Sequence, residues 1–323
     1  MLKFAVIGRN FIVDWFLSAA SEFPELKLHG VYSRTKETAL EYAEKNGAEV
    51  TYTTIDEICA DKEVDMVYIA SPNLFHEEQA IAILNAKKHV FCEKPVTLSA
   101  SGLDKILETA KQNNCVFMEG MVPLHMPAFS KIRELLPKLG TIRNASFSFC
   151  QYSSRYDKFK DGIMTNAFDP TFGNGAFMDL GIYCVHFMLA LFGYPETVDG
   201  HACFLPKSID ASGVVVAGYK NKTAQIIFSK VSDSAIPSQI QGEKGCLLID
   251  SVSRPKKLTL VLKNQEPVII DTTTTRHEMS YELEDFIAQI DGKDMPEYNE
   301  ISRMGMKLCD TAREKLGIDF KIK

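Results

Sequence analysis

The chain has 323 residues, of which 46% are hydrophobic and 24% are charged. This is the composition of a folded globular protein rather than of a disordered chain, and the length favours two domains. The formal net charge of −6 gives no general attraction to nucleic-acid phosphates, so we expect no nucleic-acid partner. No apolar run is long enough to cross a membrane, and the first residues lack a signal-peptide pattern, so we expect a cytoplasmic protein without a membrane partner.

Eight cysteines are scattered along the chain, and the two that are closest in sequence lie 19 residues apart. No pair has the spacing of a zinc site or of a redox couple, and no cluster of histidine, cysteine and carboxylate residues has metal-ligand spacing. We therefore predict reduced, mostly buried thiols, in keeping with the cytoplasm, and no bound metal.

Short apolar runs alternate with helical patterns through the first third of the chain. The predicted strands are Phe4–Ile7, Leu28–Tyr32, Asp65–Ala70, His89–Cys92 and Val116–Glu119. The predicted helices between them are 13–22, 35–46, 75–86 and 99–112. This alternation indicates βαβ units and a parallel sheet.

The pattern changes after about residue 120. Helices are predicted at 127–136 and 175–191, a long strand at 142–152, several short strands within 198–271, and closing helices at 280–290 and 300–316. Strands closed by tight turns favour an antiparallel sheet. We therefore predict an α/β protein: a parallel-sheet domain over residues 1–121, then an α+β domain with a largely antiparallel sheet over 122–323.

The turn after the first strand is a candidate phosphate-binding turn. In a Rossmann domain this turn brings backbone N–H groups and a helix N-terminus to the dinucleotide pyrophosphate. Only Gly8 of the usual three glycines is present; Asn10 replaces the second, and asparagine tolerates left-handed backbone better than most residues. Gly8, Asn10, Phe11 and Ile12 are the cofactor-binding candidates here, and an ordinary βα turn is the alternative.

The end of the second strand carries no acid. An NAD site usually has Asp or Glu there for the ribose 2′-hydroxyl, whereas NADP requires a cation for the 2′-phosphate. Here Ser33 and Thr38 offer hydroxyls, and the Arg34 guanidinium can bind a phosphate. The residues favour NADP over NAD, and a solvated loop is the alternative.

Four separated motifs together resemble one family. They are S-P-N-L-F-H at 71–76, E-K-P at 93–95, G-N-G-A-F-M-D-L-G-I-Y at 173–183 and G-E-K-G at 242–245. In type and order they resemble motifs of the glucose–fructose oxidoreductase, inositol dehydrogenase and MocA (Gfo/Idh/MocA) family. The likeness extends over nearly the whole chain, and four motifs in the correct order are more specific than any one of them.

This resemblance implies a Rossmann domain that carries a nicotinamide cofactor, followed by an α/β domain with an open sheet. Lys94 would lie at the cleft between the two. Members of the family typically oxidise a secondary alcohol on a sugar, polyol or related ring, or reduce the matching ketone. Many pair through the open face of the second sheet, which implies a homodimer or homotetramer here.

Three residues are the catalytic candidates. Lys94 follows a buried strand, at the strand end where ligands bind in open α/β sheets, and its ammonium could stabilise a developing oxyanion. Asp179 and Tyr183 lie four apart on one face of a predicted helix. Tyr183, where many members have histidine, is similar to the dihydrodiol dehydrogenase and glucose–fructose oxidoreductase branch. A Lys94 ammonium would lower the pKa of Tyr183, which could then take the hydroxyl proton while Asp179 holds a neighbouring hydroxyl.

Further candidates are weaker. Around the cofactor they are Ser71, Pro72, Asn73, His76 and Glu93. His76 could instead cap a helix, and Glu93 could form a structural ion pair. His125 and Arg155 are candidates for substrate contact, the latter in a predicted loop from Ser153 to Phe168 that could set specificity. His186 is a rival base, although a packed histidine is the more favoured interpretation.

Three functions compete. The first is an NADP-dependent dehydrogenase acting on a sugar, polyol or dihydrodiol-like alcohol. The second is a non-catalytic nucleotide sensor that has kept the fold, since fold does not fix function. A sensor has no need to keep Lys94, Asp179 and Tyr183 together, so their joint presence favours the enzyme. The third, reduction of a tetrapyrrole bridge in the manner of biliverdin reductase, fits the sequence around Asp179 less well.

Overall fold

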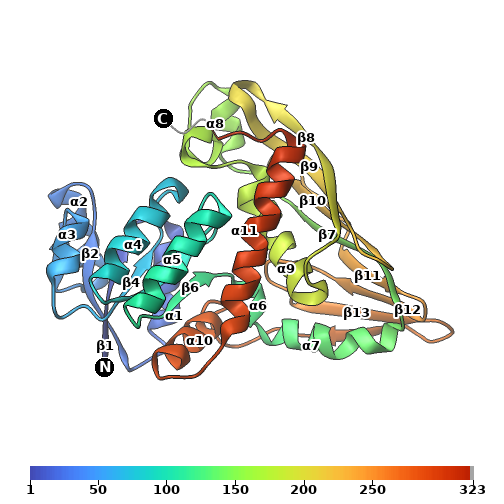
Figure 1. Ribbon diagram of the computed structural model, residues 1–323, viewed down its shortest axis with the longest axis horizontal. Coiled ribbons are helices and arrows are strands. Elements are labelled where there is room, and N and C mark those ends of the chain that lie inside the picture. Colours follow the sequence, from blue (N-terminus) through green and yellow to red (C-terminus); the bar gives the residue numbers. More distant parts are fainter. Residues whose placement is uncertain (321–323) are drawn as a thin grey trace. The chain divides into compact units, whose positions relative to one another are not determined.

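The computed structural model describes residues 1–320, which form two compact units (Figure 1). The first contains Met1–Gly120 together with Arg276–Arg303, and the second contains Met121–Thr275 together with the chain from Met304 on. The return of 276–303 to the first unit is not a feature that the sequence patterns indicate, because they place the whole of 122–323 in one domain.

The first unit is built on a six-stranded parallel sheet in the order β3-β2-β1-β4-β5-β6. Its strands are β1 (Leu2–Ile7), β2 (Leu26–Tyr32), β3 (Val50–Tyr52), β4 (Met66–Ile69), β5 (His89–Glu93) and β6 (Phe117–Gly120). Every residue of β4 is buried, as expected where helices cover both faces of a sheet. The predicted Rossmann-type parallel sheet is confirmed.

The helices of this unit come from the segments between its strands and from the returning segment, 276–303. They are α1 (Phe11–Ala20), α2 (Lys36–Asn46), α3 (Ile55–Ala60), the short η1 (Asn73–Phe75), α4 (His76–Asn85), α5 (Ala100–Gln112) and α10 (Ser280–Ile290), with the start of α11 (Pro296–Leu316). Aromatic side chains fill the core: Phe16 stacks on Tyr68 with ring centroids 3.8 Å apart. Phe286 of α10 stacks on Phe91 of β5 at 5.3 Å, and this contact holds the returning segment in the first unit.

The second unit is built on an eight-stranded sheet in the order β14-β13-β12-β11-β7-β10-β9-β8. Its strands are β7 (Ile142–Cys150), β8 (Thr197–Leu205), β9 (Ile209–Gly218), β10 (Thr223–Ser229), β11 (Ser238–Gly242), β12 (Gly245–Ile249), β13 (Lys257–Leu262) and β14 (Val268–Asp271). All neighbouring pairs are antiparallel except β7 with β10. The predicted, largely antiparallel second sheet is confirmed.

Helices cover one face of this sheet, as Figure 1 shows for α9 and the later part of α11. The helical segments are α6 (Val122–His125), α7 (Pro127–Leu135), η2 (Leu136–Leu139), α8 (Tyr156–Lys160), η3 (Asn166–Phe168), η4 (Pro170–Phe172), η5 (Phe177–Gly181), α9 (Ile182–Phe192) and η6 (Pro206–Ser208). Strand burial alternates accordingly: Phe147 of β7 is buried against Phe187 of α9, whereas Ser146 and Ser148 point to the other face. That other face carries no helix within residues 1–320.

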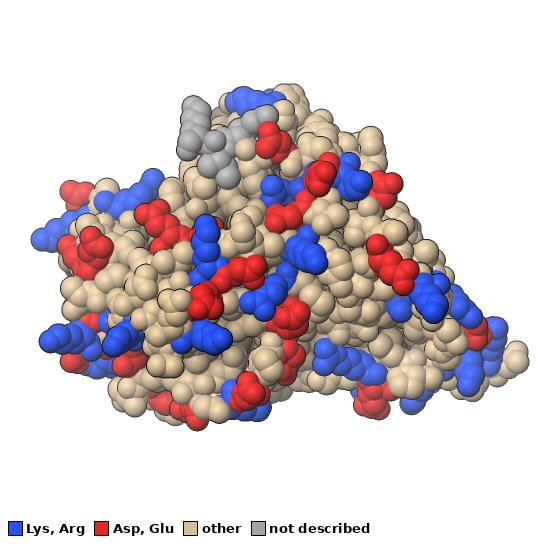
Figure 2. Space-filling view, viewed as in Figure 1, with Lys and Arg blue, Asp and Glu red and all other residues tan. Residues whose placement is uncertain are grey.

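The surface carries charges of both signs. On the face seen in Figure 2, lysine and arginine side chains are interspersed with aspartate and glutamate, and no extended area of one sign is visible. Across residues 1–320, no helix combines the length and the apolar character that a membrane crossing needs.

Candidate active site

The cofactor candidates of the first unit lie at one edge of its sheet. The parallel register pairs Ile7 with both Tyr32 and Ile69, and Ile69 with Cys92. The segments that follow β1, β2, β4 and β5 therefore leave the sheet on the same side, at its carboxyl edge. This edge, at the point where the strand order reverses between β1 and β4, is where open α/β sheets bind ligands.

Gly8 closes the turn after β1 against the end of β4. Its φ is +123°, and a Cβ built on it would lie 2.7 Å from the carbonyl oxygen of Ala70. The amide Nδ2 of Asn10 donates to the same carbonyl at 3.2 Å. A side chain at position 8 would push the two strand ends apart, so the glycine is required by this close approach.

Asn10 is the N-cap of α1. Its Oδ1 accepts hydrogen bonds from the backbone N–H groups of Ile12 at 3.1 Å and Val13 at 3.4 Å. Its φ of −90° and ψ of 176° are extended, so the expectation that Asn10 uses left-handed backbone is wrong. The residue fits here because its short side chain caps the helix. The adjacent Phe11 is exposed, at the helix end that carries the positive dipole.

The loop after β2 presents cations rather than an acid. The hydroxyls of Ser33 and Thr38 are bonded to each other at 2.6 Å, and Thr35 caps α2. Arg34 and Lys36 are exposed beside this helix start. The hydroxyl pair shapes the loop, and the guanidinium of Arg34 is the group in it best suited to a phosphate.

His76 joins two of the strand-end loops. It is 1% exposed, and its Nδ1 and Nε2 lie 2.9 Å and 2.8 Å from the backbone oxygens of Pro95 and Ser71. Burial lowers the pKa of its imidazole. The ring therefore lies beneath the edge and ties the S-P-N loop to the E-K-P loop.

The E-K-P segment rests on buried polar groups. The hydroxyl of Tyr68 donates to Glu93 at 2.6 Å, and Glu119 accepts from the backbone N–H of Val96 at 3.1 Å. Burial raises the pKa of Glu93, against the opposing effects of the Tyr68 hydrogen bond and the Lys94 charge. Lys94 itself is half-buried, directly after β5.

The G-N-G-A-F segment of the second unit is shaped by a carboxylate from β9. Asp210 is 1% exposed and accepts from the backbone N–H of Phe177 at 2.7 Å. A Cβ on Gly175, whose φ is +159°, would lie 1.8 Å from Asp210 Oδ1. Burial raises the pKa of Asp210 to about 6. The second glycine of the motif is therefore present because this carboxylate occupies the space of a side chain.

The residues that carry Asp179 form a π-helix, Phe177–Gly181, rather than the regular helical turn that the sequence predicts. Single π turns within helices often occur at functional sites. Asp179 forms an ion pair with Lys230 at 2.9 Å, and the Lys230 side chain is only 3% exposed. The sequence did not indicate Lys230, because it lies outside the four motifs.

Tyr183 lies on α9, half-buried, with its ring against that of Phe149 at a centroid distance of 5.5 Å. His186 is fully buried: its Nδ1 lies 3.0 Å from the backbone oxygen of Ile182, and its ring lies against Gly305. This is the environment of a packed histidine.

The two weaker substrate candidates lie on short helices. His125 ends α6 and is half-buried, and Arg155 is exposed at the start of α8. The predicted loop from Ser153 to Phe168 contains α8, and Tyr156 and Phe159 pack their rings on Phe168.

Comparison with known proteins agrees with this architecture. Residues 2–121 match the family model described as an oxidoreductase family with an NAD-binding Rossmann fold, and residues 129–248 match the C-terminal domain of the same Gfo/Idh/MocA family. The chain belongs to this family. It is therefore an NAD(P)-dependent oxidoreductase, as the four motifs predict.

Relatives within the family align over the full chain. The scyllo-inositol 2-dehydrogenase (NADP(+)) IolU of Bacillus subtilis (strain 168) is 38% identical over 99% of this chain and 98% of its own length. A trans-1,2-dihydrobenzene-1,2-diol dehydrogenase of Xenopus tropicalis is 25% identical over 98% and 99%. The dihydrodiol dehydrogenases are thus relatives, as Tyr183 indicates, and the inositol dehydrogenase shares more identity.

Solved structures share the fold. The crystal structure of KijD10, a 3-ketoreductase from Actinomadura kijaniata in complex with NADP and TDP-benzene, has a TM-score of 0.85, with 21% identity and 98% of each chain covered.

Proposed function

We propose that this Gfo/Idh/MocA protein is an NADP-preferring dehydrogenase that acts on a secondary alcohol, or the matching ketone, of a polyol, sugar or cyclic diol. The observation that carries the cofactor preference is the exposed Arg34 where an NAD site has an acid. The substrate class is supported by the 38% identity to a scyllo-inositol dehydrogenase and by the dihydrodiol dehydrogenases among the relatives.

The residues at the carboxyl edge of the first sheet fit a dinucleotide. Gly8 and the capped start of α1 would face the pyrophosphate, and Arg34 would bind the 2′-phosphate. Ser71, Pro72 and Asn73 follow β4, and Glu93 ends β5 at the same edge; these residues would lie along the nicotinamide half. When bound, the nicotinamide supplies the acceptor or donor of hydride.

Lys94, Asp179 and Tyr183 would act on the substrate. In the oxidative direction the Tyr183 phenolate takes the proton of the reacting hydroxyl, and the Lys94 ammonium stabilises the negative charge that develops on the oxygen. Asp179 accepts a hydrogen bond from a neighbouring hydroxyl and fixes the ring of the substrate. In the reductive direction Tyr183 returns the proton.

A substrate screen tests this proposal. Inositols, aldoses and cyclic trans-diols are offered with NADP⁺ and with NAD⁺, and reduced nicotinamide is followed by absorbance. The proposal predicts turnover of at least one ring alcohol with a higher kcat/KM for NADP⁺, and a loss of that preference in Arg34→Ala. Tight nicotinamide binding without turnover of any alcohol or ketone would favour a nucleotide sensor instead.

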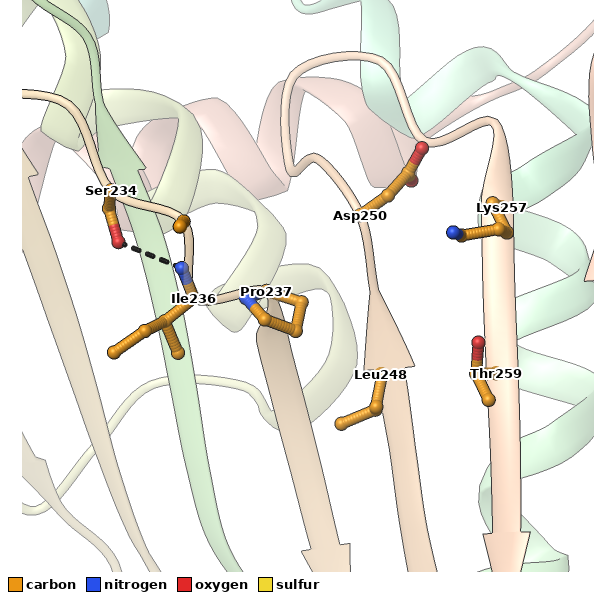
Figure 3. Close-up of a pocket in the computed structure, with 8 residues that line it drawn as sticks. Ser234, Ile236, Pro237, Leu248, Asp250, Lys257 and Thr259 are labelled. Atoms are coloured by element: carbon orange, nitrogen blue, oxygen red, sulfur yellow. Dashed lines mark hydrogen bonds between the residues drawn. The ribbon is translucent and has the colours of Figure 1, made fainter. Parts of the chain in front are cut away.

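We also propose that copies of the chain associate through the uncovered face of the second sheet. Its outward side chains are small, polar or aliphatic: Val216 on β9 is 43% exposed, and its neighbour Gln225 on β10 is half-buried. Figure 3 shows a hollow at this sheet, where Ile236 and Pro237 lie across from Leu248 and Thr259. Ile236 is 71% exposed, so its apolar side chain is available to be covered by a second copy of the chain.

A further inference from the structure

Lys230 is a buried lysine with three partners around its ammonium. Its Nζ lies 2.9 Å from Asp179 Oδ2, donates to the backbone oxygen of Ala167 at 2.8 Å, and lies 5.1 Å from the centre of the Phe168 ring. These contacts replace the water that a buried cation loses, and the desolvation cost explains why they are needed.

The backbone of Lys230 is also fixed by hydrogen bonds. The backbone N–H of Lys230 donates to Ala211 on β9 at 2.8 Å, and its carbonyl accepts from Ser153 at 2.9 Å. Backbone hydrogen bonds to the sheet and its neighbouring loop therefore fix the main chain of Lys230, and Asp179 and Ala167 fix its ammonium. Asp179 is 35% exposed, so its carboxylate faces solvent while one of its oxygens is paired with Lys230.

From this geometry we infer that Lys230 is a positioning residue for substrate binding. Its ion pair selects one orientation of the Asp179 carboxylate, and its bond to Ala167 couples that orientation to the segment which follows α8. The inference rests on the proposed role of Asp179 in holding a substrate hydroxyl. Lys230 does not contact the substrate itself. It determines how well Asp179 is placed to bind the substrate hydroxyl.

A double-mutant cycle tests this inference on the full-length protein. The four proteins are wild type, Lys230→Met, Asp179→Asn and the double variant, and the measurements are kcat and KM for the best alcohol of the screen. Each single substitution should raise KM about ten- to hundredfold, the range expected for losing a hydrogen bond to a charged group. In the Asp179→Asn background, Lys230→Met should change KM less than about threefold, because the group through which it acts has lost its charge.

Two further variants separate positioning from folding. Lys88 is also a buried lysine, 5% exposed, and it donates to the backbone oxygens of Asp61 and Val64. Lys88→Met should lower the melting temperature and leave KM unchanged. Lys230→Arg keeps the charge, so its KM should lie between that of wild type and the raised KM of Lys230→Met. If Lys230→Met does not fold, the cycle is run with Lys230→Arg, whose displaced guanidinium should raise KM only when Asp179 is present.

The outcomes are distinct. Effects of Lys230→Met and Asp179→Asn that multiply in the double variant would overturn the inference and leave the proposed function standing. An unchanged KM in Asp179→Asn would remove the proposed role of Asp179 and the inference with it. NADPH affinity, measured by fluorescence titration, should stay unchanged in all four proteins, and a parallel loss of affinity would also contradict positioning of the substrate.

Discussion

Asp210 sets the backbone of the segment that leads to Asp179 and Tyr183. The carboxylate lies where a side chain at position 175 would otherwise be, and it accepts the N–H of Phe177 at the start of the π-helix. A buried acceptor of backbone N–H groups is a strong local constraint, because each unpaired group would be costly. The precision of the candidate site therefore depends on a residue outside the motif.

Gly175→Ala should destabilise the second unit. The added methyl group would overlap Asp210 Oδ1 at 1.8 Å and would also demand a φ of +159° from a residue with a side chain. We expect a loss of about 2–4 kcal/mol in the free energy of unfolding, measured by urea denaturation. Gly162→Ala is the matched control: its φ is +81° but no atom lies within 4 Å of the new Cβ, so it should cost only about 1 kcal/mol. Equal losses in the two variants would contradict the overlap.

The titration of Asp210 should appear in the pH dependence of stability. Burial raises its pKa from 3.8 to about 6 in the folded protein. Below pH 3.8 both states hold the proton, and between the two values only the folded state does, so its contribution to stability is lost as the pH rises through about 6. At about 1.4 kcal/mol per pKa unit, the loss amounts to roughly 3 kcal/mol.

Asp210→Asn isolates this contribution, because the amide does not titrate while other carboxylates behave as in wild type. The free energy of unfolding of wild type relative to Asp210→Asn should fall by about 2 kcal/mol between pH 4 and pH 7. A difference that stays constant over this range would show that Asp210 is not perturbed.

The sequence predicts which residues form the candidate site better than it predicts the residues that contact them. Lys94, Asp179 and Tyr183 stand out because they lie in motifs, whereas Lys230 and Asp210 follow from contacts across the sheet. Asp210 lies 35 residues after Gly175, and nothing in either local pattern links the two. Such pairs become visible only when the strand register is known.

At the scale of elements, the start of helix α1 contributes both to stability and to the proposed cofactor site. Its N-cap, Asn10, satisfies two N–H groups of the first turn and also binds Ala70 at the end of β4. The capping side chain therefore holds the helix start against the strand end where the pyrophosphate would bind.

Asn10→Ala should lower both stability and NADPH affinity. Loss of an N-cap costs about 1 kcal/mol of stability, and the loosened helix start should weaken NADPH binding severalfold in a fluorescence titration. Thr54→Ala is the control, because Thr54 caps α3 in a capping box after the edge strand β3. It should cost similar stability and leave NADPH affinity unchanged, and a weakened affinity in the control would remove the argument for Asn10.

The alternation of strands and helices predicts most elements, because buried parallel strands are apolar throughout and helices are amphipathic. It misses β3 and α3, which have three and six residues and too few positions to show a period. It also cannot place α10, since an apolar helix face does not specify the sheet that it covers. The stack of Phe286 on Phe91 decides that placement.

At the scale of the whole molecule, the uncovered face of the second sheet is the feature that a single copy leaves unexplained. Val216→Lys places a charge on this face at β9, the strand next to the β8 edge, between Asp199 and Gln225 on the neighbouring strands. We expect the variant to sediment as a monomer where wild type sediments as a dimer or tetramer, because covering this face would remove the lysine from water even with Asp199 beside it.

Leu40→Lys is the control for this experiment, as Leu40 is similarly exposed, at 44%, on α2 of the first unit. It should keep the wild-type oligomeric state. A wild-type protein that sediments as a monomer at all concentrations would contradict the proposed interface.

In the proposed NADP-dependent alcohol oxidation, Tyr183 transfers the proton and Lys94 stabilises the oxyanion. The most direct test is kcat of Tyr183→Phe with NADP⁺ and the best alcohol of the screen, in protein whose melting temperature and NADPH affinity match wild type. If Tyr183 is the general base, kcat should fall about 10²–10⁴-fold, the usual contribution of such a group. Full turnover in Tyr183→Phe would contradict this role and would direct the search for the base to another residue.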